Sequence, residues 1–142
     1  MIHQKYTVAI NVAKSPGEVF SCVNNPGKWW PEDFEGECTK VNDEFVFTSG
    51  DSHYSKNKVI ELIPGQKIVW LVTDSIRKTD NFSWTGTKFI FELSSKDGST
   101  LLEFTYDGFV LDDETDRLAQ VCDMVIKDML YNFITHGKAK QV

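Results

Sequence analysis

The sequence has few cysteines, no long apolar run and fewer basic than acidic residues. Its three cysteines, Cys22, Cys38 and Cys122, are widely spaced and form no C-x-x-C pair. This pattern argues against a disulfide framework and against a zinc site, so we expect reduced, structural thiols. No apolar run reaches the roughly 20 residues that span a bilayer. The N-terminal segment also lacks the basic and apolar regions of a signal peptide. We therefore expect a cytoplasmic protein without a membrane span.

The charge balance and the scarcity of histidine exclude further classes. Fifteen Lys and Arg against 21 Asp and Glu give a formal net charge of −6, which would repel a phosphate backbone. We expect no nucleic-acid partner. The three histidines, His3, His53 and His136, do not lie near a nucleophile motif, and no set of ligands has metal-site spacing. We expect no metal and no cofactor, and we assign no catalytic residue.

The overall composition is that of a folded globular protein. Hydrophobic residues make up 41% of the 142 residues and charged residues 25%, which is enough to bury a core. No repeat, low-complexity segment or linker divides the chain. The sequence predicts a single domain over residues 1–142.

The first 35 residues predict a strand and two short helices. Residues 3–12 alternate, with Tyr6, Val8, Ile10 and Val12 on one face. Ser15-Pro16-Gly17-Glu18 is a capping box with proline at the first helical position, and Asn24-Asn25-Pro26-Gly27 ends the helix. Lys28-Trp29-Trp30 predicts a second brief turn.

Residues 36–107 have the pattern of an antiparallel sheet, and the chain then ends in a helix. Strands are expected at 44–48, 53–62, 67–73, 87–93 and 100–106, with a polar connection at 74–84. Apolar residues at steps of three and four, including Cys122, Val125, Met129 and Phe133, predict a helix over 113–136. Acids at 112–114 precede it, and Gly137 would cap its end. The fold class is α+β, a curved antiparallel sheet around a long C-terminal helix.

This order of motifs resembles the START-like superfamily with its helix-grip fold. Within it, the chain is similar to homologues of the C-terminal domain of the activator of heat-shock protein 90 ATPase. The likeness is carried by Ser15-Pro16-x-Glu18-Val19-Phe20, Trp30, residues 59–70, Thr87-x-Phe89-x-Phe91-x-Leu93 and Gly98-x-Thr100-x-Leu102-x-Phe104. Two features differ from that family: Tyr106 stands where members often have histidine, and the long helix has no tryptophan.

The resemblance implies a cavity between the sheet and the C-terminal helix, because relatives bind lipids, hormones or polyketide-like compounds. Aromatic residues form 13% of the chain, and many stand at inward positions of the strands. The same rings could instead fill a core. Met124 and Met129 would add an adaptable wall. The expected lining is Trp30, Phe34, Phe45, Phe47, Trp70, Trp84, Phe89, Phe91, Phe104, Tyr106, Cys122, Val125 and Met129.

The adjacent tryptophans should diverge, because neighbours on a helix differ by about 100°. We expect Trp30 to point inward, because it matches the family position. Trp29 would then be a partly exposed lid, with Trp84 opposite it across the opening.

Three functions remain open at this stage. The first is binding of an apolar or amphipathic small molecule, lipid-like or aromatic, in the cavity. The second is a co-chaperone-like module in which acids such as Asp112, Asp113 and Glu114 meet a chaperone or another protein. The third is a cyclase or hydrolase, which would need a polar pair inside the cavity, such as Tyr106 with Asp107 or with His53.

Overall fold

The computed structural model describes residues 3–30, 33–50, 53–77, 85–110, 120 and 122–137. Within them the strands are β1 (His3–Val12), β2 (Asp33–Gly36), β3 (Glu44–Ser49), β4 (His53–Ile63), β5 (Lys67–Arg77), β6 (Lys88–Lys96) and β7 (Ser99–Val110). The helical elements are α1 (Pro16–Val23), the 3₁₀ turn η1 (Pro26–Lys28), the π-helical η2 (Met124–Leu130) and α3 (Tyr131–His136). No helix in these ranges is long and apolar enough to cross a membrane.

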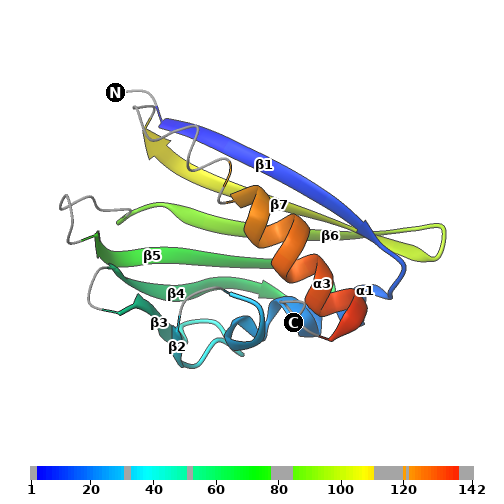
Figure 1. Ribbon diagram of the computed structural model, residues 1–142, viewed down its shortest axis with the longest axis horizontal. Helices are drawn as coiled ribbons and strands as arrows, with labels where there is room; N and C mark the ends of the chain where they lie inside the picture. Colours follow the sequence, from blue (N-terminus) through cyan, green and yellow to red (C-terminus); the bar gives the residue numbers. More distant parts are fainter. Residues whose placement is uncertain are drawn as a thin grey trace.

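The strands form one antiparallel sheet in the order β1-β7-β6-β5-β4-β3-β2. The first strand therefore pairs with the last, and the C-terminal helix crosses one face of the sheet diagonally toward α1 (Figure 1). The α+β helix-grip architecture predicted from the sequence is confirmed.

Two details of the sheet differ from the prediction. β5 continues to Arg77, so the first residues of the expected polar connection are strand, and the rest, 78–84, lies outside the described residues. β2 was not predicted, because four residues with one half-buried side chain leave almost no pattern. Its end is fixed by Gly36, whose φ is +119° and whose Cα lies against the Glu44 backbone.

The Ser15 half of the predicted capping box forms before α1, while the Glu18 carboxylate contacts the Ser15 hydroxyl. Ser15 Oγ accepts a hydrogen bond from the Glu18 amide at 3.2 Å, and the same hydroxyl lies 3.3 Å from Glu18 Oε1, to which it can donate. Pro16 occupies the first turn as expected. Val19 and Val23 are fully buried, so the cap positions a helix whose apolar side closes one end of the core.

The C-terminal helix departs from a regular α-helix. Residues 124–130 are π-helical, and a π turn holds an additional residue compared with an α turn. This moves the inward position near the end of the helix from Phe133, which is half-buried, to Ile134, which is buried. Gly137 caps the helix in the left-handed conformation, as predicted. The expected first turns at 113–119 lie outside the described residues.

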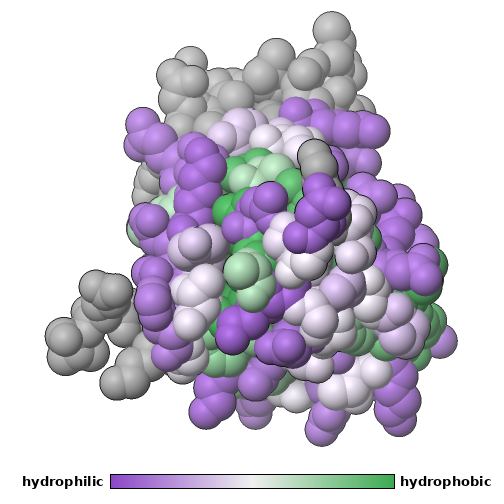
Figure 2. Space-filling view, turned by 90° about the vertical axis from the view of Figure 1, so that its right-hand side faces the viewer, coloured by the Kyte–Doolittle hydropathy of each residue, from purple (hydrophilic) through white to green (hydrophobic). Residues whose placement is uncertain are grey.

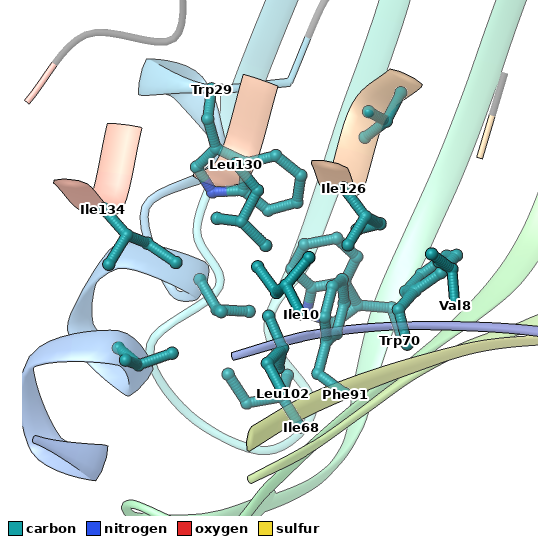
Figure 3. Close-up of a cluster of buried hydrophobic side chains, with 14 of the residues drawn as sticks. Val8, Ile10, Trp29, Ile68, Trp70, Phe91, Leu102, Ile126, Leu130 and Ile134 are labelled. Atoms are coloured by element: carbon teal, nitrogen blue, oxygen red, sulfur yellow. The ribbon is translucent and has the colours of Figure 1, made fainter. Parts of the chain in front are cut away.

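The core lies between this helix and the inner face of the sheet. Ile126, Leu130 and Ile134 point from the helix toward Val8, Ile10, Phe91 and Leu102 of the sheet, with Trp29 beneath Leu130 (Figure 3). Seen from the right-hand side of Figure 1, the surface is largely hydrophilic, and hydrophobic residues show in a central area and at parts of the rim (Figure 2).

Candidate functional site

Of the two adjacent tryptophans, Trp29 lies deeper than predicted, while Trp30 packs inward against the core as a half-buried ring. Trp29 is 0% exposed, and its Nε1 donates to the Cys22 carbonyl at 2.9 Å. Trp30 is half-buried. Both amides bond the Pro26 carbonyl, at 3.2 and 2.8 Å, so the tight turn sends consecutive side chains in different directions. The expectation of Trp29 as an exposed lid is wrong; it is a core residue.

One part of the predicted lining is a filled core. The Trp70 ring lies 4.8 Å from Phe91, 5.0 Å from Phe45 and 6.4 Å from Trp29, measured between centroids. Phe91 in turn lies 5.0 Å from Phe104. All five side chains are buried, and these rings pack against one another. At these positions the rings act as packing.

A second group of rings runs across the inner face from β3 to β7, and we call it the aromatic wall. It consists of Phe47, Trp30, Phe89 and Tyr106. Trp30 stacks on Phe47 at 4.5 Å and meets Phe89 edge-on at 5.5 Å. Phe89 stacks on Tyr106 at 5.0 Å. Trp30 and Phe89 are only half-buried, so this group retains ring surface that other atoms could cover.

Next to the aromatic wall lies a set of buried polar side chains, which we call the polar row: Ser55, Asn57, Ser75 and Thr87. Ser55 pairs with Phe47 of the wall, and Thr87 shares a hydrogen bond with Tyr106. Ser55 and Asn57 lie near the start of β4, Ser75 near the end of β5, and Thr87 directly before β6. These strand ends lie away from α3 (Figure 1). Asn57 Oδ1 has no hydrogen-bond partner.

The sequence analysis did not single out the polar row. Ser55 and Asn57 alternate with Lys56 and Lys58 and stand in phase with Val59, a clear core position. Their positions in this alternation place them on the inner face of the sheet, and this alternation is the sequence signal that could have identified them. Polar residues at inward positions are informative because buried polar groups need partners.

The remaining predicted lining residues have varied positions. Cys122, Val125 and Met129 are buried on the C-terminal helix, as expected. Phe34, on β2, is half-buried and lies 6.0 Å from Phe47. Met124 is 44% exposed, so its assignment to the cavity wall is wrong; it stands on the outer side of the helix. Trp84 and the acids at 112–114 lie outside the described residues.

Two buried titratable groups of the described core, the Tyr106 hydroxyl and the Cys122 thiol, are held in their neutral forms. Burial raises the pKa of the Tyr106 hydroxyl, against an opposing hydrogen bond with Thr87. Burial also raises the pKa of the Cys122 thiol to about 12. Other buried polar side chains among the described residues include Ser, Thr and Asn. These groups can donate or accept hydrogen bonds but supply no charge.

The strand geometry does not support the two example pairs named for a cyclase or hydrolase, Tyr106 with Asp107 and Tyr106 with His53. Asp107 follows the inward Tyr106 on β7, so it points to the opposite face of the sheet, where it lines a groove. His53 begins β4, and β5 and β6 separate it from β7. Three inter-strand spacings of about 4.8 Å amount to roughly 14 Å. Neither expected partner is therefore placed beside Tyr106.

The groove on the outer face has a volume of about 250 Å³. Its lining is Ile60, Glu61, Lys67, Val69, Lys88, Ile90 and Asp107. Lys67 and Glu61 form an ion pair at 3.3 Å along one side. The groove is thus a short aliphatic strip with a charged border.

Solved structures with this arrangement identify the fold. No family model and no curated protein matches the chain. The Aha1 dimer from Colwellia psychrerythraea superimposes with a TM-score of 0.77 at 20% identity, over 97% of this chain and 99% of that one. The fold is the START-like helix-grip fold.

Two further solved structures superimpose on this chain. DynU16, a putative protein in the dynemicin biosynthetic locus, gives a TM-score of 0.75 at 13% identity, covering 96% of this chain and 49% of its own. CalU16 from Micromonospora echinospora gives 0.70 at 14% identity, covering 95% of this chain and 78% of its own. At these identities the likeness establishes the helix-grip fold.

Proposed function

We propose that the protein binds an apolar or amphipathic small molecule between the C-terminal helix and the inner face of the sheet. The observation that carries this proposal is the pairing of the aromatic wall with the polar row. A ring system or hydrocarbon would cover the half-buried faces of Trp30 and Phe89. Its polar end would reach Asn57 and its neighbours. Sites for small molecules typically combine apolar surface with a few placed polar groups.

The fold supports the same proposal. DynU16, a putative protein in the dynemicin biosynthetic locus, is among the structures that superimpose on this chain. The proposed activity is non-covalent binding, because the pairs needed for acid–base chemistry on Tyr106 are separated in space or by the sheet.

Native mass spectrometry of freshly purified protein tests the proposal most directly. A defined mass excess, released by solvent extraction, is the expected result and gives the ligand class. The neutral dye N-phenyl-1-naphthylamine provides a second readout, since its fluorescence rises in an apolar site. A clean apo mass together with no dye binding would contradict the proposal.

A matched pair of variants on the C-terminal helix tests where the dye binds. Val125→Phe adds a ring on the buried side of the helix, and Met124→Phe adds one on the exposed side. We expect Val125→Phe to weaken dye binding at least about ten-fold by occupying space. Met124→Phe should leave binding within about two-fold of the wild type. Equal binding by both variants would place the dye outside the helix–sheet interior.

The outer-face groove favours a second candidate function, a protein-interaction module. Ile60 is exposed and Ile90 half-buried in a strip bordered by charges, and the Aha1 structure that superimposes on this chain is a dimer. Its partner would be a second copy, a chaperone or another protein. Sedimentation velocity tests self-association: a dimer that Ile90→Lys dissociates would support it, and a monomer at about 200 µM would count against it.

A further inference from the structure

Asn57 is the one member of the polar row with an unpaired atom. Its side chain is fully buried, between Phe45 of β3 and Val72 of β5 in the sheet register. The Nδ2 group donates to the Ser55 carbonyl at 3.3 Å and lies 3.5 Å from Ser55 Oγ. These bonds fix which end of the amide is nitrogen, since a carbonyl oxygen only accepts. Oδ1 is the acceptor left over.

A buried carbonyl oxygen without a partner requires an explanation, because native interiors pair almost all such groups. Packing does not supply one here: the neighbours in register are a phenylalanine and a valine, which offer no side-chain donor. An aliphatic residue of similar size would fill the position without an unpaired atom. The polar side chain is therefore suited to a group that arrives from outside the chain.

The surroundings of Asn57 define the charge of that group. The buried polar groups among the described residues include the side chains of Ser, Thr and Asn, the Tyr106 hydroxyl and Trp70 Nε1, and these groups are neutral. A carboxylate or phosphate entering this region would lose its hydration and meet no cation there. A neutral hydroxyl or N–H group, in contrast, can donate to Oδ1 at a small desolvation penalty.

We infer that Asn57 Oδ1 accepts a hydrogen bond from a neutral hydroxyl or N–H group of the bound molecule. The site then selects uncharged, donor-bearing aromatic or amphipathic molecules over anionic lipids and over molecules that only accept hydrogen bonds. This inference rests on the proposed function, because it names the ligand class and a specificity-determining residue of the same site.

Three naphthalenes of nearly equal size test the inference: 2-naphthol carries a neutral donor, 2-methoxynaphthalene only accepts, and 2-naphthoate is an anion. Each is used to displace N-phenyl-1-naphthylamine from the protein. We expect 2-naphthol to displace the dye about ten-fold more effectively than either of the others, since one buried hydrogen bond is worth about that factor.

Asn57→Leu assigns the preference to this residue, with Asn11→Leu as a control that makes the same change at an exposed position of β1. Asn57→Leu should reduce the preference for 2-naphthol over 2-methoxynaphthalene to less than about two-fold, and Asn11→Leu should preserve it. Circular dichroism checks that both variants fold. The ranking of probes on the wild type stands as a test even if Asn57→Leu does not fold.

The outcomes separate the inference from the proposed function. Dye binding with equal displacement by all three probes, or by none, would overturn the role of Asn57 and leave the interior site intact. The same preference in Asn57→Leu as in the wild type would also overturn it. Absence of dye binding and of any mass excess would overturn the proposed function itself.

Discussion

The Tyr6 hydroxyl donates a 2.7 Å hydrogen bond to Asp123 Oδ1 and so joins the first strand to the C-terminal helix across 117 positions of sequence. Lys127 lies 3.9 Å from the same oxygen. The bond lies at the point where the helix begins to cross the sheet, next to the buried Cys122. It therefore holds the helix over the inner face on which the proposed ligand would lie.

Replacement of Tyr6 by phenylalanine should loosen this connection. We expect Tyr6→Phe to lower the free energy of unfolding by about 1 kcal/mol, because the bond has a charged acceptor but is partly exposed. Urea unfolding measures the change. Thr7→Val is the matched control: it removes a 3.1 Å hydroxyl contact with Thr105 that is exposed on the outer face. A loss from Thr7→Val as large as that from Tyr6→Phe would contradict a special role for Tyr6.

Stability should fall in alkaline solution. The hydrogen bond to Asp123 and partial burial raise the pKa of Tyr6 to about 12, above the value of about 10 for an unfolded tyrosine. Between these values the unfolded chain releases the proton first, so this contribution is complete below pH 10 and disappears toward pH 12. Tyr106 and Cys122 act in the same direction. Urea midpoints from pH 8 to 11 should decline, and less steeply in Tyr6→Phe. A parallel decline in both proteins would contradict the assignment.

Substitution of Trp29 should mainly affect stability, and substitution of Trp30 should mainly affect ligand binding. Trp29→Ala should reduce the free energy of unfolding by about 3–5 kcal/mol, because it removes a fully buried ring. Trp29→Phe keeps an aromatic ring at this position and should destabilise the protein less, so it is the variant to use in binding assays. Trp30→Ala should lower stability by less, but it should weaken dye binding at least about ten-fold by removing the centre of the aromatic wall. Unchanged dye binding in Trp30→Ala would move the ligand away from the wall.

Gly36 should tolerate no side chain. A Cβ at this position would lie 2.6 Å from the Glu44 carbonyl oxygen and 2.7 Å from Phe45 Cα, both backbone atoms, at a φ of +119°. We expect Gly36→Ala to reduce stability by about 1–3 kcal/mol. Gly50→Ala is the comparison, since its φ of +55° is also positive but no atom lies within 4 Å. Equal losses in a thermal unfolding assay would show that the close contact is unimportant.

The fold could be predicted because its signals are local and agree with one another. Alternation placed Val8, Ile10 and Phe91 on the inner face, and the capping box located α1. The full burial of Trp29 could not be predicted, since it depends on how a three-residue turn directs each side chain. The shift from Phe133 to Ile134 depends on a π turn that has no strong sequence pattern.

The candidate site was predicted in part. The aromatic residues were named from their inward parity, but which of them fill the core and which form the wall depends on packing between strands far apart in sequence. Asn57 was not predicted because a single polar residue on an apolar strand face does not by itself indicate a binding site. Its unpaired oxygen is visible only in the structure.

The pairing of β1 with β7 brings together two segments that are far apart in the chain, with His3 opposite Val110. Contacts of such long sequence separation form slowly, because a large loop must close before they can form. During synthesis β1 has no sheet partner among the described strands until β7 has also left the ribosome. Until then the strand is an open sheet edge with one apolar side, a state that favours aggregation.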